Sequence, residues 1–134
     1  MLKVKTNAGQ GYKLTAANTG LKTGANSPLT DAYTISNAST STGTTATAQA
    51  DDTFAFTTVG TVNTAKSTIN TVFASGATYV GYGTSAAATS LLTASGPTGD
   101  TADVLTITNQ VKISFDTPAG TYTDTITYVA TPTY

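Results

Sequence analysis

The sequence predicts an all-β protein, an antiparallel β-sandwich of Ig-like or jelly-roll-like type with roughly seven to nine strands. Almost a quarter of the 134 residues are Thr, whose β-branched side chain suits a pleated, half-exposed surface. Apolar and polar residues alternate with a period of two in several short runs, and turn residues recur every ~8–12 residues. No long helical pattern competes with this reading. The length fits one domain, residues 1–134.

The N-terminal segment predicts a hairpin. Leu2 and Val4 alternate with lysines, Asn7–Gly11 has the composition of a turn, and Tyr12–Ala16 alternates again. Two such runs joined by a short turn are typical of an antiparallel pair. Further strands are expected at Ala32–Ser36, Thr53–Val59, Thr78–Gly83 and Thr89–Ala94.

Two segments in the middle of the chain depart from this strand pattern. Residues 37–49, Asn37–Gln49, are a Ser/Thr-rich stretch with little apolar mass, which predicts an exposed loop. Thr64–Phe73 leaves two alternatives open: a short helix capped by Asn63, or a strand favoured by its β-branched residues.

The C-terminal third predicts a second hairpin. Leu105–Phe115 alternates, Asp116–Gly120 has turn chemistry, and Tyr122–Ala130 alternates again. Asn109 interrupts the apolar face of the first run, which predicts a bulge or a turn there. Asp124 falls on the apolar face of the second run, so it should lie at a sheet end or hydrogen-bond a loop.

The missing residue types exclude several functions. The chain has no His, Cys, Trp, Arg or Glu, and enzymes draw most catalytic groups and metal ligands from that set. We therefore expect a non-enzymatic protein with no catalytic residue, no metal and no cofactor. Only 10% of residues are charged, against about 25% in an ordinary domain. The six scattered Lys predict no nucleic-acid partner.

The same composition bears on location. No apolar run reaches the ~18 residues of a membrane span, so no membrane insertion is expected. Few charges and abundant Thr, Ser, Gly and Asn are typical of an extracellular or cell-surface protein. Met1–Lys5 lacks the apolar core of a signal peptide, so we expect any targeting segment to have been removed.

The C-terminal segment carries a Gly-x-Tyr-x-Asp pattern, then alternating apolar residues and an aromatic near the end. The matching residues are Gly120, Tyr122, Asp124, Ile126, Tyr128 and Tyr134. This segment resembles the closing strand of spore-coat-protein-U-like and chaperone–usher pilus subunits. The resemblance implies a sandwich that is completed by a strand of the next subunit. The chain lacks the Cys pair and the long N-terminal donor tail of the pilus subunits.

Both ends also resemble Thr-rich surface proteins of ultrasmall, candidate-phylum bacteria. The early Val-x-Thr-Asn…Gly-Tyr motif is matched by Val4, Thr6, Asn7, Gly11 and Tyr12. The late Gly-Thr-Tyr-Thr…Thr-Tyr-x-Ala-Thr-x-aromatic ending is matched by Gly120, Thr121, Tyr122, Thr123, Thr127, Tyr128, Ala130, Thr131 and Tyr134. This resemblance implies a cell-surface domain.

These observations predict a secreted structural subunit of a filament, pilus or surface coat, whose partners are copies of itself. Leu2–Thr6 and Tyr128–Tyr134 are candidate inserting strands, with the alternative that both close their own sheet. The candidate assembly residues are Leu2, Val4, Tyr122, Ile126, Tyr128 and Tyr134.

Two other functions stay open. One is an adhesin or lectin-like module that stacks a surface glycan on Tyr79 and Tyr82, which flanking Gly residues predict to be an exposed pair. The other is a spacer domain without a ligand. Tyr12, Tyr122 and Tyr128 are instead expected to pack on strand core faces, with the hydroxyl at a rim.

Three minor hypotheses concern ions and modification. Asp51–Asp52 and Asp100–Asp103 are either Ca²⁺ ligands or solvated turn formers. Asn37-Ala38-Ser39 is a glycosylation sequon. An isopeptide bond would need a Lys, an Asn and a carboxylate. The residues considered for it are Lys13, Lys112, Asn109, Asp116 and Asp124.

Overall fold

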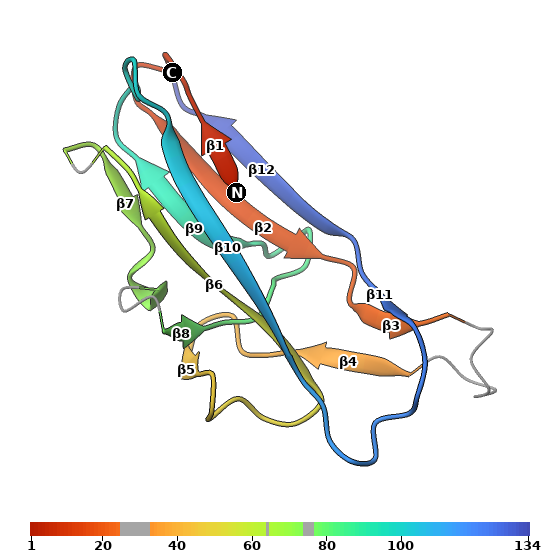
Figure 1. Ribbon diagram of the computed structural model, residues 1–134. Helices are drawn as coiled ribbons and strands as arrows, with labels where there is room; N and C mark the ends of the chain where they lie inside the picture. The colour runs from red at the N-terminus through yellow and green to blue at the C-terminus, as the bar shows by residue number, and fades with distance from the viewer. Residues whose placement is uncertain (25–32, 64, 74–76) are drawn as a thin grey trace.

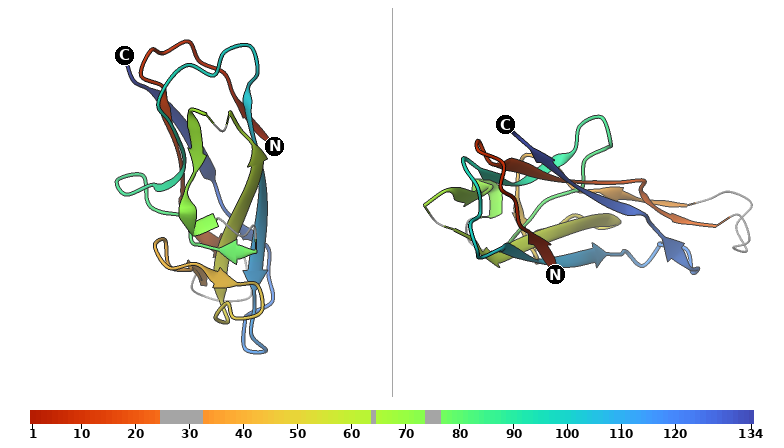
Figure 2. Two further views of the ribbon diagram at one scale, coloured as in Figure 1. Left: turned by 90° about the vertical axis from the view of Figure 1, so that its left-hand side faces the viewer. Right: turned by 90° about the horizontal axis from the view of Figure 1, so that it is seen from above.

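A computed structural model describes residues 1–24, 33–63, 65–73 and 77–134. The protein is nearly all β, and two sheets pack against each other as a β-sandwich (Figures 1 and 2). The larger sheet has the order β1 (Leu2–Val4), β10 (Asp103–Lys112), β6 (Thr53–Thr61), β4 (Thr34–Asn37), β3 (Leu21–Thr23), β11 (Tyr122–Thr123). The smaller sheet has the order β12 (Ile126–Pro132), β2 (Tyr12–Asn18), β9 (Thr89–Ala94), β7 (Ser67–Ile69).

Two short elements complete the described fold. β5 (Thr44–Thr45) pairs with β8 (Thr78–Tyr79), and Thr71–Phe73 forms one 3-10 turn, η1. The named strand pairs are antiparallel except β4 with β6, which run parallel. Val80 extends β8 by an antiparallel bridge to Phe56.

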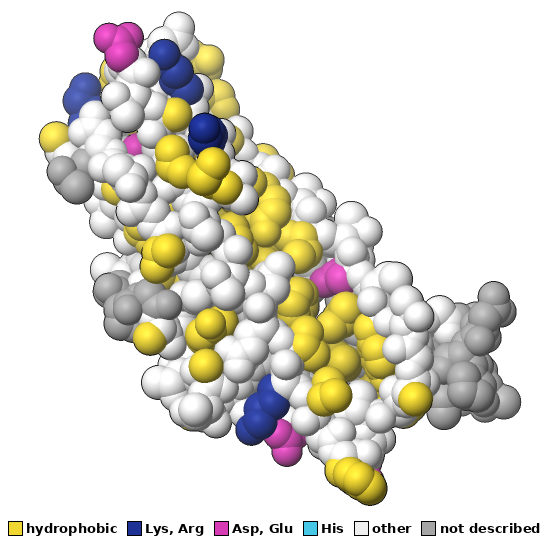
Figure 3. All heavy atoms as spheres, viewed as in Figure 1, with side chains coloured by type: hydrophobic (Ala, Val, Ile, Leu, Met, Phe, Trp, Pro, Cys, Tyr) yellow, Lys and Arg dark blue, Asp and Glu magenta, His cyan; other side chains and the backbone are white. Residues whose placement is uncertain are grey.

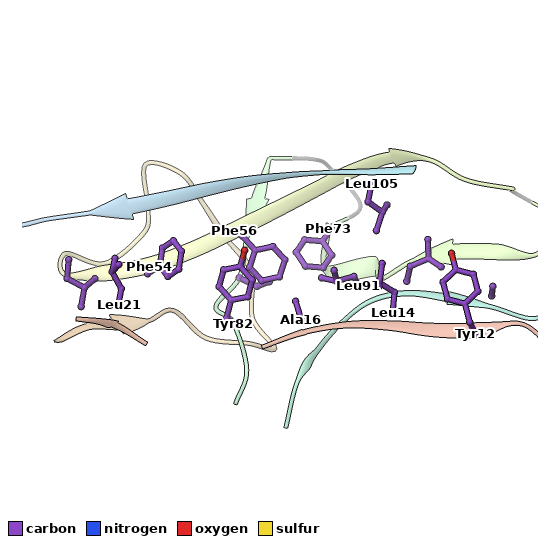
Figure 4. Close-up of a cluster of buried hydrophobic side chains, with 14 residues drawn as sticks. Tyr12, Leu14, Ala16, Leu21, Phe54, Phe56, Phe73, Tyr82, Leu91 and Leu105 are labelled. Atoms are coloured by element: carbon purple, nitrogen blue, oxygen red, sulfur yellow. The ribbon is translucent and has the colours of Figure 1, made fainter. Parts of the chain in front are cut away.

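The core lies between the two sheets and is aromatic at its centre (Figure 4). Phe56 stacks on Tyr82 with ring centroids 4.1 Å apart, and Phe54 and Phe73 pack beside this pair. Such offset and tilted aromatic contacts add stability beyond the burial of apolar area. With few large apolar residues, this protein concentrates them in one thin layer. The other buried members are Tyr12, Leu14, Ala16, Leu21, Ile35, Val80, Leu91, Leu92, Ala94 and Leu105.

Most of the expected strands form. Thr89–Ala94 is β9, Thr53–Val59 lies within β6, and the N-terminal runs are β1 and β2. The strand expected at Ala32–Ser36 is found at Thr34–Asn37, and Ala32 lies outside the described residues.

The two ambiguous segments have mixed structures. Of Thr64–Phe73, Thr64 lies outside the described residues, and the rest contains β7 and η1. Asn63 does not cap a helix; its Oδ1 accepts from the Ala65 amide in a turn. The Ser/Thr-rich stretch is not exposed throughout, because it contains β5 and ends at Gln49, which is buried.

Both predicted hairpins are wrong. β1 pairs with β10 whereas β2 pairs with β12 and β9, so the first two strands lie in different sheets. β10 pairs with β6, whereas β11 pairs with β3 and β12 with β2. The connection from β1 to β2 crosses from one sheet to the other, whereas β10 and β11 lie in the same sheet with β6, β4 and β3 between them. Alternation predicts which face of a strand is buried, but it does not identify the strand's partner.

The expected bulge at Asn109 is also wrong. β10 pairs with β6 in unbroken register from Val104 to Lys112. Asn109 is tolerated on the inner face because its Oδ1 accepts a 2.6 Å hydrogen bond from the hydroxyl of Tyr82. A buried phenol needs such an acceptor, and Asn provides it.

The prediction for Asp124 is confirmed. It lies in the break between β11 and β12, opposite the break between β2 and β3. Its carboxylate accepts from the Asn18 side chain at 2.6 Å and from the Thr19 amide and hydroxyl at 3.2 and 3.1 Å. Gly20 adopts a positive φ of 97° in this break. The antiparallel ribbon of β2–β3 with β11–β12 therefore bends at this point and joins the two sheets.

Candidate functional site

The larger sheet has an incompletely paired edge. β1 covers β10 only from Asp103 to Leu105. Beyond that point, in the described part of the chain, β10 has a strand on its β6 side alone. We call the unpaired side of Thr106–Ile113 the open edge. Backbone donors and acceptors along such an edge are free to pair with another strand.

Apart from Asn109, the inner-face side chains along the open edge are apolar, and they become more exposed with distance from β1. Leu105, under β1, is buried, and Ile107 is half-buried. Val111 and Ile113 are 43% and 61% exposed. A sandwich core that leads into exposed apolar residues lacks cover at that point.

A gap separates the open edge of β10 from the C-terminal strands β11 and β12, which form its opposite side. Among the residues that the structure describes, β11 and β12 are the last strands of their sheets, so each also has one unpaired edge. Tyr122, Ile126 and Tyr128 are half-buried and pack against the core. Figure 3, in the same view as Figure 1, shows apolar side chains at the surface between β10 and these strands. The gap thus exposes one margin of the core between two unpaired edges.

A polar bridge crosses the middle of this gap. Tyr82 donates to Asn109 of β10, and its hydroxyl lies 3.3 Å from that of Tyr128 in β12. Burial, with a smaller contribution from the Tyr128 hydrogen bond, raises the pKa of Tyr82 well above its usual value. The phenol therefore stays neutral and links the two sheets where no strand does.

The lower end of the gap opens into an apolar trough of about 390 Å³. We call this hollow the trough. Its walls come from the end of β10, from β3 and β4, and from β11 with the preceding loop. Apolar side chains dominate the lining, which includes Leu21, Ile35, Val111, Ile113, Pro118 and Tyr122.

A carboxylate fixes the loop that closes the trough. Asp52, which has a positive φ of 54°, accepts hydrogen bonds from Thr117, from the amide and hydroxyl of Ser114, and from Tyr33. These bonds, that of Thr117 first, lower the pKa of Asp52 below its usual value. The β10–β11 loop is therefore tied to the start of β6.

A second carboxylate anchors the other end of β10. Asp103 is 1% exposed and accepts from the Tyr12 hydroxyl at 2.7 Å, the Ser67 hydroxyl at 2.6 Å and the Asn63 amide at 2.7 Å. Burial, and after it the hydrogen bond to Asp103, raises the pKa of the Tyr12 hydroxyl above its usual range. The interpretation of Asp103 as a solvated loop carboxylate is therefore wrong, because it joins β10 to β2 and β7.

The structure brings together most of the candidate assembly residues. Tyr122, Ile126 and Tyr128 line one side of the gap, and Leu2 and Val4 lie in β1, which closes its upper end. Tyr134 is 84% exposed and lies away from the gap, beside the β1–β2 loop that bonds to Thr133. Both candidate inserting strands pair within their own chain, the alternative that the sequence left open. Sequence reasoning missed the unpaired edge of β10, because the alternation of this strand is that of an ordinary buried strand.

The proposed glycan pair does not have the expected exposure. Tyr82 is 1% exposed and stacked on Phe56, while Tyr79 is half-buried in β8. A sugar ring would have to displace the core to reach Tyr82. Tyr12 is buried as expected, but its hydroxyl also lies inside, on Asp103.

The minor hypotheses gain no geometric support. Among the described residues no group of three or more acidic side chains could hold a metal ion. The Asn37 amide that would carry a sugar donates to Asn18 and to the Tyr82 carbonyl. Lys112 contacts Asp51 and the Gln49 carbonyl, while Asn109 contacts Tyr82. These contacts do not assemble a Lys–Asn–carboxylate group.

Comparison with known proteins adds no relative. No family model, no curated protein and no solved structure matches the chain. Within the described ranges, no helix has the length and apolar character needed to span a bilayer.

Proposed function

We propose that this protein is a secreted, non-enzymatic structural subunit of an extracellular filament, pilus or surface coat. Its copies join by strand addition or by β-edge contacts. The observation that carries the proposal is the open edge of β10, where unpaired backbone lies beside exposed Val111 and Ile113. Within the sandwich class we propose an Ig-like or jelly-roll-like arrangement of roughly seven to nine principal strands.

The chemistry of the gap supports an extended partner. A strand that enters beside β10 gains backbone hydrogen bonds, each worth about 0.5–1.5 kcal/mol net. Alternate side chains of that strand would cover Ile107 and Val111 on one side and Tyr122 and Ile126 on the other. Buried apolar area contributes about 25 cal/mol per Å². The same edge could accept a copy of this chain without burying an ion, because its inner face carries no charged residue between Leu105 and Ile113.

Substitution of the open edge tests the proposal. We expect the wild-type chain to form oligomers or fibres whose size rises with protein concentration. Val111→Lys with Ile113→Lys should weaken self-association at least about tenfold, because an incoming strand would bury two ammonium groups. Both positions are already exposed, so the fold should persist. Sedimentation velocity and negative-stain microscopy measure the outcome.

Val59→Lys is the matched control. Val59 is 48% exposed and points outward from β6, where it pairs with Thr106 of β10 and does not border the open edge. This variant should assemble like the wild type. A chain that stays monomeric at high concentration, or equal losses in the control and the edge variant, would contradict the proposal.

A further inference from the structure

The loop between β10 and β11 displays an aromatic ring in solvent. Phe115 is 103% exposed, although the residues around it are held in place. Ser114 and Thr117, on either side, both donate to Asp52, and the Ser114 amide also donates to the Thr117 hydroxyl at 2.9 Å. Because the loop is anchored on both sides of the ring, Phe115 is presented in a fixed position where a partner surface can cover it.

The opposite end of the molecule carries a hollow of about 490 Å³. It is lined by Lys5, Thr6, Asn7, Pro97, Gly99 and Asp100. Its two walls, the β1–β2 and β9–β10 loops, are fastened together. The Thr6 amide donates to the Thr98 hydroxyl at 3.0 Å, and the Thr98 amide donates to the Thr6 carbonyl at 3.1 Å. Figure 1 shows these loops at the end of the sandwich remote from the β10–β11 loop.

The size of the hollow suits an aromatic ring. An apolar cavity of about 150 Å³ is already enough to hold benzene, and this open hollow is larger. Pro97 and Lys5 are among the lining residues, and the methylene stem of a Lys can cover apolar surface while its ammonium stays in water. An ammonium beside an aromatic ring gains a further attraction of about 0.5–1 kcal/mol at an exposed site.

Charge is divided between the same two ends. Lys3, Lys5 and Lys13 lie on or beside the strands that meet at the hollow, and the Lys66 carbonyl accepts from the amide of Ser95 there. Asp100 is the exposed carboxylate at this end, since Asp103 is buried. At the Phe115 end lie Asp51, Asp52 and Asp116, with Lys112 paired to Asp51 at 3.0 Å. Asp116 follows Phe115 directly and is exposed, so the ring is presented together with a negative charge.

We propose that the Phe115 loop of one copy docks into the hollow of a second copy, with Asp116 beside Lys5. This inference rests on the proposed function and adds a contact separate from the open edge. The two surfaces differ and lie at opposite ends, so the contact is heterologous and does not close. Repetition generates a filament that is polar along the long axis of the sandwich.

Three single variants and one double variant test the docking, each measured by sedimentation velocity at low salt. Phe115→Ala should weaken end-to-end association at least about tenfold without changing stability, because the ring touches nothing in the monomer. Asp116→Lys and Lys5→Asp should each weaken association as well. The doubly substituted chain, Lys5→Asp with Asp116→Lys, should regain most of the wild-type association, because it restores an opposite-charge pair at the contact. Lys22→Asp, which makes the same charge change in β3, is the control and should associate as the wild type does.

The outcomes separate this inference from the proposed function. If Val111→Lys with Ile113→Lys weakens assembly but Phe115→Ala does not, the docking is overturned and the open edge stands. If the double charge swap fails to restore association, the pairing of Asp116 with Lys5 is wrong and the proposed docking falls with it. A wild-type chain that stays monomeric at every concentration overturns both.

Discussion

At the scale of single residues, the protein uses its few carboxylates as acceptors for hydroxyl and amide groups. Asp52, Asp103 and Asp124 each gather three or more donors from elements distant in sequence. Donors that are neutral, such as Thr, Ser, Tyr and backbone amides, replace the Lys and Arg of ordinary proteins. Hydrogen bonds to a charged acceptor are worth about 1.5–3 kcal/mol, so these sites compensate for a thin apolar core.

Asp103→Ala tests this use of a carboxylate. The substitution leaves the Tyr12 hydroxyl, the Ser67 hydroxyl and the Asn63 amide without their acceptor inside the protein. Each buried unsatisfied donor costs about 1–3 kcal/mol, so the free energy of unfolding should fall by about 3 kcal/mol or more. Urea unfolding followed by circular dichroism measures it. Asp100→Ala, in the exposed loop nearby, should change stability by less than about 0.5 kcal/mol; similar losses in both variants would refute the role of Asp103.

At the scale of elements, the sequence predicts strands better than it predicts their partners. Thr89–Ala94 is recovered in full, and its C-terminal end is marked by the turn residues Ser95-Gly96-Pro97. β3 and β5 escape prediction because runs of two or three residues do not establish a period. The hairpins fail because Asn7–Gly11 and Asp116–Gly120 look like tight turns but connect strands that do not pair: β1 and β2 lie in different sheets, and β10 and β11 are separated by three strands of one sheet. Turn composition predicts that the chain changes direction. It does not predict which strand the next segment pairs with.

The candidate site was predictable in part for the same reason. The alternation of Tyr122, Ile126 and Tyr128 marks one wall of the gap correctly. The other wall could not be identified, because the exposure of Val111 and Ile113 depends on where β1 ends. The sequence wrongly predicts that Tyr82 is exposed, because its flanking Gly residues are typical of a loop. Gly81 is instead packed against Ala38, where an added Cβ would lie 1.8 Å from the carbonyl oxygen.

Gly11 tests the crossing between sheets at the start of β2. Its φ is +85°, and an added Cβ would lie 2.1 Å from the carbonyl oxygen of Ala94 in β9. Gly11→Ala should therefore lower the free energy of unfolding by at least about 2 kcal/mol, through backbone strain and a forced shift of β9. Gly9→Ala is the control in the same loop, because nothing lies within 4 Å of its Cβ position. Thermal unfolding compares the two, and equal melting temperatures would show that β2 and β9 do not approach this closely.

At the scale of the whole molecule, the sandwich is open along part of one side, between β10 and the C-terminal strands. β1 and the polar bridge from Tyr82 hold the gap at its top and middle, and the trough lies at its lower end. The three residues of β1 pair only with Asp103–Leu105 of β10. The rest of the β10 edge is therefore unpaired in the monomer, and a partner could cover it.

Amide hydrogen exchange tests whether this margin is open. In dilute solution, β10 amides that point toward β6 should exchange at least about tenfold more slowly than those that point to the open edge. β2 has a strand on each side and should be protected at every position. At concentrations where the protein associates, the edge-facing amides of β10 should become protected too. Uniform protection of β10 in the dilute monomer would mean that its edge is already covered.

The pairing of β2 with β12 has a kinetic consequence. β2 can pair with β12 only when it meets a segment more than a hundred residues later in the chain, and β1 must likewise meet β10. Loop-closure entropy must be overcome before either ladder gains a hydrogen bond, so maturation is expected to be slow, on a scale of milliseconds to seconds. During that interval the aromatic residues of β6 are exposed to solvent, and the chain is prone to wrong associations. Such a slowly folding chain benefits from a surface with few apolar sites for wrong association, and a surface rich in Thr hydroxyls is of this kind.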